Sequence, residues 1–315
     1  TNGVASALQI SRYIKELNKD IPICWGGVHP TLFPQSLLDE ECVDYFCWGE
    51  GERFCVELSE HLEGKREIDT VEGISYKKDG QVQSVRREYY LDINELGIPD
   101  YDLLDIDRYL DADFSAYSGK TRKKTGKFIA VNTGVGCPFD CTFCWNTHRS
   151  QKYRIKTLDK LMENLDYVVK RFDPDLVHLQ DDLFFANKNR FFGFLDEYDK
   201  RGYRFQWFTN CRAEYISENY INDEVLDRIG DSCVWLGVGV ESGSDEMRKK
   251  LAKRLTAEQI YKAAEILGRH NILTGYAFMT GLPEEQLEHT IATMDMMQKI
   301  KDRHKSARFA FQCYR

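Results

Sequence analysis

The sequence has little of what would place it in a membrane, on an export route or on nucleic acid. No stretch approaches the run of about 18 apolar residues that a membrane-spanning helix needs. The opening TNGVASALQISRYIKEL lacks the basic segment followed by an apolar stretch that marks a signal peptide. The net charge of −8 argues against a broad electrostatic grip on phosphates. With 315 residues, 42% of them hydrophobic, we expect a folded cytoplasmic protein without a transmembrane segment or a nucleic-acid partner.

The sequence also lacks a regular disulfide framework. Seven of its ten cysteines are scattered singly, at positions 24, 42, 47, 55, 211, 233 and 313. In a chain of this length, that pattern favours free thiols in a reducing compartment. The other three, Cys137, Cys141 and Cys144, fall within eight residues in the stretch GVGCPFDCTFCWN. This cluster needs an explanation of its own.

The first 70 residues have the pattern of half a doubly wound (Rossmann-like) domain. A predicted helix over Ala5–Leu17 leads to the apolar run Ile21–Trp25, and a second apolar run, Val43–Trp48, leads to a predicted helix over Glu52–Leu62. Alternating helices and strands are typical of a parallel sheet with helices on its faces. Only the latter half of such a domain is recognisable, so the chain is expected to begin in mid-domain.

Residues 71–126 predict a linker that contains a β-ribbon, with its turn at Lys78-Asp79-Gly80. From residue 127 to residue 315 the pattern changes. Six apolar runs, separated mostly by helical patterns, predict six strands: KFIAVNT, LVHLQ, YRFQWF, CVWLGVGV, ILTGYAFMTG and ARFAFQC. Six βα repeats predict a partial parallel barrel, an α/β fold in which chemistry lies in the loops after the strands. Cys137 follows the first of these strands.

The cysteine cluster has three explanations. A structural zinc site needs four ligands, and the fourth is not obvious, although His148 is near enough in sequence to be considered. Three free thiols in one turn are disfavoured because clustered thiols invite oxidation. A three-cysteine site with one metal position open to a non-protein ligand suits an iron–sulfur cluster.

The segment CPFDCTFC resembles the C-x3-C-x-aromatic-C signature of radical S-adenosylmethionine (SAM) enzymes, and the resemblance extends over residues 127–315. It implies that Cys137, Cys141 and Cys144 hold a [4Fe–4S] cluster whose open iron binds the amino and carboxylate groups of SAM. One electron, from a donor such as flavodoxin or ferredoxin, would then cleave SAM to methionine and a 5′-deoxyadenosyl radical. Phe143 would lie beside the adenine.

The same resemblance implies further SAM contacts at the ends of the later strands. Asp182 can equally be a solvated acidic turn, and Arg212 can be a surface ion pair rather than a partner of the SAM carboxylate. Glu241 is expected to contact the ribose or the amino group, and the GLP segment that starts at Gly281 is expected to pack by the adenine. The implied set is Phe143, Gln180, Asp181, Arg212, Glu241, Ser242, Gly281 and Pro283.

The first region resembles the cobalamin-binding domain of cobalamin-dependent radical SAM enzymes. The loop GGVHPT follows one predicted strand and WGEGE follows the next. A lone Gly-Gly pair can also be a tight turn. The resemblance implies a cobalamin site at Gly26, Gly27, His29, Gly49 and Gly51, in which His29 orders the loop rather than binding cobalt. A motif for the lower cobalt ligand would lie before Thr1, and the chain is expected to be a fragment cut at both ends.

These resemblances imply a cobalamin-dependent radical SAM enzyme, with methylation of an unactivated carbon in a small metabolite, lipid or natural product as the expected reaction. A cyclisation or oxidation on the same cofactors is the alternative. A transfer-RNA methylthiotransferase ranks lower, because the scattered upstream cysteines form no second triad and the chain is acidic. A non-catalytic iron–sulfur or corrinoid sensor is a further alternative. The sequence does not identify the substrate.

Overall fold

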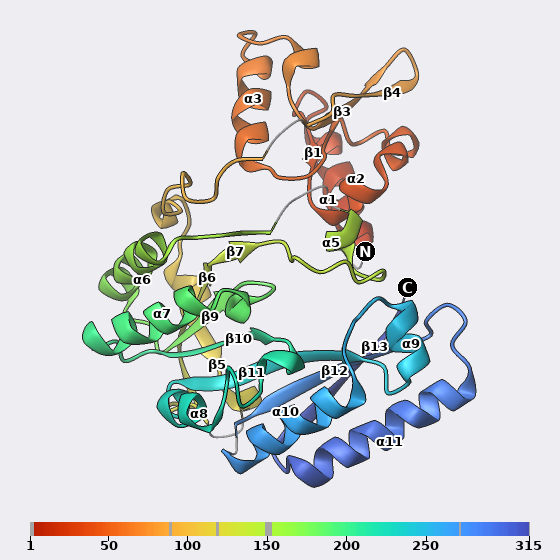
Figure 1. Cartoon of the computed structure of the whole chain (residues 1–315). Coiled ribbons are helices and arrows are strands. Elements are labelled where there is room, and N and C mark those ends of the chain that lie inside the picture. The colour runs from red at the N-terminus through yellow and green to blue at the C-terminus, as the bar shows by residue number, and fades with distance from the viewer. Residues whose placement is uncertain (1–2, 88–89, 118–119, 149–152, 271, 315) are drawn as a thin grey trace. The chain divides into compact units, whose positions relative to one another are not determined.

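Six parallel strands form most of one curved sheet in the C-terminal part of the chain (Figure 1). The computed structural model describes residues 3–87, 90–117, 120–148, 153–270 and 272–314. The chain forms two compact units, residues 1–92 with 148–151 and residues 93–147 with 152–315. The sheet of the second unit has the order β13-β12-β11-β10-β9-β6-β5. Its strands are β6 (Thr125–Asn132), β9 (Leu176–Gln180), β10 (Gln206–Cys211), β11 (Cys233–Glu241), β12 (Thr274–Thr280), β13 (Ala307–Cys313) and the antiparallel edge strand β5 (Asp111–Asp113).

Helices lie between consecutive parallel strands of this sheet. They are α6 (Leu158–Phe172), α7 (Lys188–Lys200), α8 (Asp223–Ile229), α9 (Asp245–Lys250), α10 (Ala257–Arg269) and α11 (Leu287–Arg303). The predicted partial (βα)6 barrel is therefore confirmed. Among the described helices, none is both long enough and apolar enough to cross a membrane.

The ends of these helices follow from local sequence. In α6, Thr157 Oγ1 accepts a hydrogen bond from Lys160 N at 3.3 Å, and the helix ends at Asp173, whose φ of +47° breaks the helical geometry. A capping box begins α10, since Thr256 and Gln259 each bond the backbone of the other. Apolar side chains on one face of α6 are buried, as the helical spacing predicts.

Strand β11 shows how the sheet separates core from cavity. Leu236, Val238 and Val240 are buried and belong to the main apolar core, together with Ile260 and other residues of α10. The alternate positions carry Trp235, Gly237 and Gly239, which line a cavity. Because successive strand residues point to opposite faces, the inner face of the sheet is left open above two glycines.

The first unit contains a smaller sheet with the order β1-β2-β3-β4. Strands β1 (Cys24–Trp25) and β2 (Tyr45–Cys47) are parallel, as the sequence predicts, and β3 (Ile74–Lys78) and β4 (Gln81–Ser84) follow antiparallel. The predicted ribbon turn is at Asp79-Gly80, where both φ angles are positive. Because β3 pairs with β2, this ribbon belongs to the sheet. The helices of this unit are α1 (Val4–Leu17), α2 (Val28–Leu32) and α3 (Glu52–Leu62).

Short elements complete the described chain. They are the helices α4 (Asp107–Leu110) and α5 (Trp145–His148), the antiparallel pair β7 (Gly134–Val135) and β8 (Arg154–Ile155), and the 3-10 turns Pro34–Asp39, Ile68–Thr70, Tyr101–Leu103, Ser115–Tyr117, Phe184–Ala186 and Ala213–Tyr215. Strand β7 precedes the segment that carries the three clustered cysteines, and β8 follows it.

Candidate functional site

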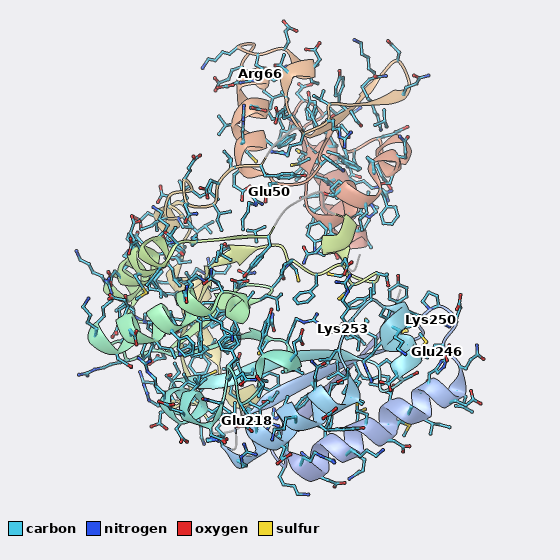
Figure 2. All side chains as sticks on the ribbon, in the orientation of Figure 1. Glu50, Arg66, Glu218, Glu246, Lys250 and Lys253 are labelled. Atoms are coloured by element: carbon cyan, nitrogen blue, oxygen red, sulfur yellow. The ribbon has the colours of Figure 1, made fainter. Side chains whose placement is uncertain are left out.

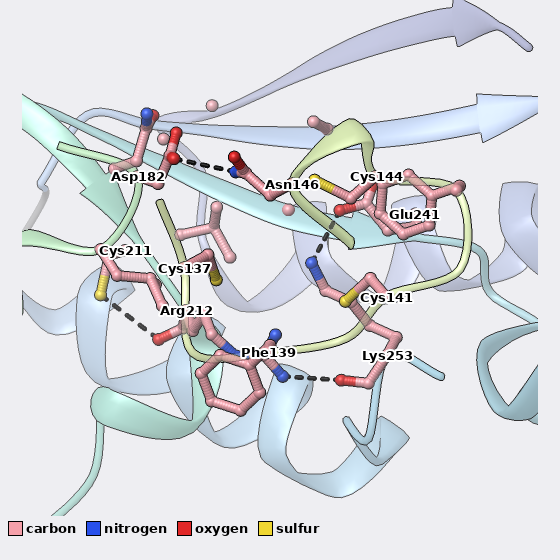
Figure 3. A pocket seen from close by; sticks show the side chains of 18 of the residues that line it. Cys137, Phe139, Cys141, Cys144, Asn146, Asp182, Cys211, Arg212, Glu241 and Lys253 are labelled. Carbon is pink, nitrogen blue, oxygen red and sulfur yellow. Dashed lines mark hydrogen bonds and ion pairs between the residues drawn. The ribbon is translucent and has the colours of Figure 1, made fainter. Parts of the chain in front are cut away.

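A cavity of about 400 Å³ lies against the inner face of the sheet in the second unit (Figure 3). Of the residues predicted for the site, those lining it are Cys137, Cys141, Cys144, Phe143, Arg212 and Glu241. These residues come from the cysteine loop, the end of β10 and the end of β11. The structure therefore brings together six of the eleven residues predicted for the cluster and SAM.

The cysteine loop is anchored through backbone atoms. Thr142 N donates to Leu251 O at 3.1 Å, and Cys144 N donates to Cys141 O at 3.0 Å. Cys141 is buried, whereas Cys137 and Cys144 are partly buried. Burial raises the pKa of the Cys137 and Cys144 thiols, and the neighbouring Asp182 carboxylate raises it further. Both are therefore neutral thiols at neutral pH when no metal is bound, and metal binding would release their protons.

The donor set fits an iron–sulfur cluster better than a single metal ion. No three His, Cys, Asp or Glu side chains among the described residues lie close enough together to hold one ion. The side chain of His148, considered above as a fourth zinc ligand, lies outside the described residues. The three thiols instead border one cavity, whose lining also includes the side-chain-free positions Gly237, Gly239 and Gly275. Three soft donors around an open space suit a multinuclear cluster with one unligated metal.

A buried ion pair lies at the end of β11. The register with β12 shifts between Gly239 and Glu241, and Glu241 has a φ of +72°, which is unusual for a residue with a side chain. Lys253 Nζ donates to Glu241 Oε1 at 2.7 Å, and both side chains are at most 10% exposed. The ammonium also lies 6.0 Å from the centre of the Phe143 ring. The cavity thus presents one cation and one anion beside the aromatic residue of the cysteine loop.

Arg212 lies beneath the cysteine loop and is only 5% exposed. Its guanidinium carbon is 3.8 Å from the centre of the Phe139 ring. Its Nη2 donates to Lys253 O at 2.6 Å, and its Nε donates to the Glu214 carboxylate. The ion pair considered from the sequence is therefore present, with Glu214 as the partner, but it is buried rather than at the surface.

The acidic residues after β9 separate into two groups. Asp181 is buried outside the cavity lining, and its carboxylate accepts hydrogen bonds from Arg190 Nη2 at 2.8 Å, Thr133 Oγ1 at 3.1 Å and Leu183 N at 2.8 Å. These contacts tie β9 to the start of the cysteine loop. Gln180 is exposed and also lies outside the lining. Asp182 does line the cavity and accepts from Asn146 Nδ2 at 2.9 Å.

The remaining predicted SAM contacts also lie outside the lining. The hydroxyl of Ser242 is buried and accepts from Ser244 N at 3.2 Å, which orders the turn before α9. Gly281 has a φ of +73°, its N donates to Glu285 Oε2 at 2.6 Å, and Pro283 is exposed. The middle residue of this segment, Leu282, belongs to the apolar cluster against which Phe143 packs. Leu282 of the GLP segment therefore belongs to the apolar surface on which Phe143 packs.

Several residues of the cavity have no distinct signal in the sequence. Lys253 lies in a polar loop twelve positions after Glu241, and nothing in the pattern links the two. Phe139 is the middle one of the three residues between Cys137 and Cys141, and the cysteine spacing alone gives it no role. Asn210 and Trp235 also line the cavity, and only strand alternation places them on the inner face.

In the first unit, two glycine loops follow the parallel strands β1 and β2. Gly27 has a φ of +94° and Gly49 a φ of +87°, which favour glycine. Thr31 joins the loops, because its Oγ1 donates to Gly27 O at 2.7 Å and accepts from Gly49 N at 3.0 Å. Gly26 precedes this arrangement at the end of β1, and Gly51 is the N-cap of α3. Four of the five residues predicted for cobalamin are therefore at one edge of the small sheet.

His29, the fifth residue, lies in α2. Its Nε2 is 3.2 Å from Ser36 Oγ, and its ring is 5.6 Å from that of Phe33. Burial lowers the pKa of His29, so the ring is neutral at neutral pH. These contacts fit the predicted role of His29 in ordering the loop.

The half-barrel and the cavity bordered by three thiols agree with the proteins to which this sequence is similar. Residues 131–297 match the model of the Radical SAM superfamily, and the chain belongs to this family. It is 27% identical over 305 residues to an uncharacterised methyltransferase of Pyrococcus horikoshii, covering 95% of this chain and 62% of that protein. It is also 27% identical over 304 residues to the anaerobic magnesium-protoporphyrin IX monomethyl ester cyclase of Rubrivivax gelatinosus, covering 94% of this chain and 52% of the cyclase.

The fold extends the similarity across both units. The structure of OxsB, a cobalamin-dependent SAM radical enzyme with aqua-cobalamin and SAM bound, superposes with a TM-score of 0.75 at 21% identity. The match covers 96% of this chain and 43% of OxsB. The chain thus spans about half the length of the proteins it resembles.

Proposed function

We propose that the protein is a cobalamin-dependent radical SAM enzyme that methylates an unactivated carbon of a small metabolite, lipid or natural product. The observation that carries the proposal is the cavity bordered by Cys137, Cys141 and Cys144 at the end of a six-stranded half-barrel. The similarity to a named methyltransferase and to OxsB supports the reaction class and the cofactors.

When bound, the cluster would supply one electron to cleave SAM into methionine and a 5′-deoxyadenosyl radical. The three cysteines would hold it as thiolates. Phe143 offers an apolar ring face to the adenine, and its ring packs against a group of buried apolar side chains that includes Leu282. Glu241, which lies in the cavity lining and is held by Lys253, would contact the ribose or the amino group of SAM. The apolar wall of the cavity would exclude water from the radical.

In the first unit, Gly26, Gly27, Gly49 and Gly51 are the residues that would hold cobalamin, and the corrinoid would supply the methyl group when bound. The fit rests on the open space at Gly27 and Gly51, whereas a Cβ at Gly26 would meet Cys47 Cβ at 3.5 Å. A Cβ built at Gly27 or Gly51 meets no atom within 4 Å, and a Cβ at Gly49 meets only the side chains of Arg87 and Tyr90, at 3.6 Å and 3.7 Å. Backbone without side chains allows a flat ligand to approach closely.

The proposal is tested by anaerobic reconstitution with iron and sulfide, followed by optical and electron paramagnetic resonance (EPR) spectra with and without SAM. Hydroxocobalamin is added to a parallel sample. We expect a reduced-cluster signal that SAM perturbs, together with retained corrinoid. Cys141→Ser should lose the cluster, whereas Cys233→Ser, which changes a buried cysteine outside the lining, should keep it. Tight binding of zinc with no cluster would sink the proposal.

A cyclisation or oxidation on the same cofactors is the second candidate, and the similarity to the anaerobic cyclase of Rubrivivax gelatinosus favours it. Mass spectrometry of the products distinguishes the two. Methylation adds the mass of one CH₂ to the substrate and yields S-adenosylhomocysteine from a second SAM. Turnover that yields 5′-deoxyadenosine without any methylated product would favour the second candidate.

A further inference from the structure

The segment between the first two clustered cysteines rests on a single buried cation. Phe139 lies midway between Cys137 and Cys141, and its ring covers the guanidinium of Arg212 at 3.8 Å (Figure 3). A guanidinium bonds in its plane and stacks through its face, so it can do both at once. The contact with Phe139 uses the face.

The in-plane donors of Arg212 hold two further segments. Nη2 donates to the backbone oxygen of Lys253 at 2.6 Å, and Nε donates to Glu214, two residues away. The ammonium of Lys253 is held in turn by Glu241. Arg212 therefore joins the cysteine loop, the end of β10 and the segment after α9.

The same contacts argue against Arg212 as a partner of the SAM carboxylate. Its charge is already balanced by Glu214, and its side chain is 6% exposed. The second oxygen of Glu214 is buried and has no hydrogen-bond partner among the described residues. If Arg212 turned towards a ligand, it would leave this carboxylate buried without its cation, which is costly.

We propose that Arg212 is a positioning residue that holds the cysteine loop and Lys253 in place and makes no contact with SAM. The inference rests on the proposed function in that it takes the three cysteines as the ligands of the cluster. The variants that test it are Arg212→Lys, which keeps the charge but loses the planar stacking face, and Phe139→Leu, which keeps an apolar side chain but loses the ring.

The first test needs no cluster. In the iron-free whole chain, the alkylation rates of Cys137, Cys141 and Cys144 are measured by peptide mass spectrometry against buried Cys233. We expect Cys141 to react about tenfold faster in either variant, because losing a desolvated cation–π contact should make local opening of the loop about that much more favourable. The double variant should react no faster than the single variants, because both substitutions remove the same contact between Phe139 and Arg212. Unchanged rates in Arg212→Lys would overturn the inference.

The second test uses the reconstituted protein. We expect the cluster of Arg212→Lys and Phe139→Leu to lose iron to a chelator about tenfold faster than the wild type. The SAM dissociation constant of the fraction that keeps its cluster should stay close to the wild-type value. The opposite pattern, an intact cluster with SAM affinity reduced at least about tenfold in Arg212→Lys alone, would assign Arg212 to SAM binding instead.

Leu226→Ala serves as the control for general destabilisation, because Leu226 is fully buried in α8 and lies outside the cavity lining. It should lower the free energy of unfolding without changing the alkylation pattern. If the wild type assembles no cluster, the proposed function fails, while the alkylation test still decides whether Arg212 and Phe139 hold the loop.

Discussion

The two units shape their candidate sites by different means. In the second unit, buried charged side chains fix the site: Arg212 lies under the cysteine loop, and Lys253 is paired with Glu241. In the first unit, the candidate site is shaped mainly by backbone conformation, with positive φ angles at Gly27 and Gly49. The hydroxyl of Thr31 joins these two glycines. The first unit also buries two charged side chains: Glu57 pairs with Arg53, and Arg87 Nη2 donates to Glu50 O at 2.7 Å in the loop after β2.

The contrast indicates what each ligand would require. Three thiolates must be held at fixed separations, so their loop is clamped from several sides. A flat ligand needs a surface that is free of side chains, and glycine backbone provides such a surface. We therefore expect substitutions in the second unit to act through lost partners, and substitutions in the first to act through added atoms or backbone strain.

The largest effect is expected from the clustered cysteines. Changing Cys137, Cys141 or Cys144 to serine should abolish the cluster and SAM cleavage, because each is one of the three ligands proposed for the cluster. Corrinoid retention by the first unit should be unaffected. Iron content, 5′-deoxyadenosine formation and corrinoid absorbance measure the three properties. Parallel loss of corrinoid would show that the two sites are not independent.

The ion pair gives the next largest effect. Lys253→Met leaves the Glu241 carboxylate buried without its cation, so we expect a loss of about 3–5 kcal/mol in the free energy of unfolding. The control is Lys250→Met on the same segment, where the exposed lysine pairs with Glu246 (Figure 2) and also with Glu284. Exposed pairs contribute at most about 1 kcal/mol. Equal losses in urea denaturation would contradict the role assigned to burial.

The third prediction concerns the stability of the second unit at acidic pH. His304 is fully buried, donates from Nε2 to Ile272 O at 2.7 Å, and accepts from Tyr276 through Nδ1 at 3.0 Å. Burial lowers its pKa from 6.5 to about 4. Between these values the unfolded chain binds the proton and the folded chain does not, so stability falls as the pH falls.

We expect the His304 contribution to reach about 3 kcal/mol across that pH range. His304→Gln removes this titration, and the difference between the two pH profiles of unfolding isolates it from the carboxylates. Because His304 belongs to the second unit, a separate transition of the first unit should keep its pH dependence. Identical profiles for the variant and the wild type would contradict the prediction.

The smallest effect is expected at the glycines of the first unit. Gly49→Ala places a side chain at a φ of +87°, which costs about 1–2 kcal/mol, and it should weaken corrinoid binding. Gly51→Ala is the matched control for stability, because Gly51 has a φ of −94° and open space around it. Thermal unfolding of the two variants measures the difference. A Gly49→Ala protein as stable as Gly51→Ala would show that backbone strain does not shape this loop.

Sequence patterns predicted the parts of the molecule that repeat or cluster. Alternating strands and amphipathic helices predicted the half-barrel, and the cysteine spacing predicted the loop that borders its cavity. Glu241 was also predicted, because a carboxylate directly after an apolar strand must lie at the end of the sheet. These features depend on local order along the chain, which a sequence displays directly.

The partners of these residues could not be predicted in the same way. Lys253 reaches Glu241 from a loop twelve residues away, and Arg212 reaches Phe139 of the cysteine loop from the end of β10. Asp181 follows a strand as Glu241 does, yet its carboxylate pairs with Arg190 in α7 rather than facing the cavity. Such pairings depend on how helices and loops pack in three dimensions, and no periodic signal records them.

The two outer strands of the large sheet have different consequences for solubility. Strand β5 is three residues long and carries exposed Asp111 and Asp113, which discourage pairing with another sheet. Within the described chain, no strand pairs with the outer side of β13, where Phe311 is 47% exposed. We therefore expect self-association of this polypeptide to proceed through β13, and a charged residue at Phe311 to be the first substitution to make for crystallisation.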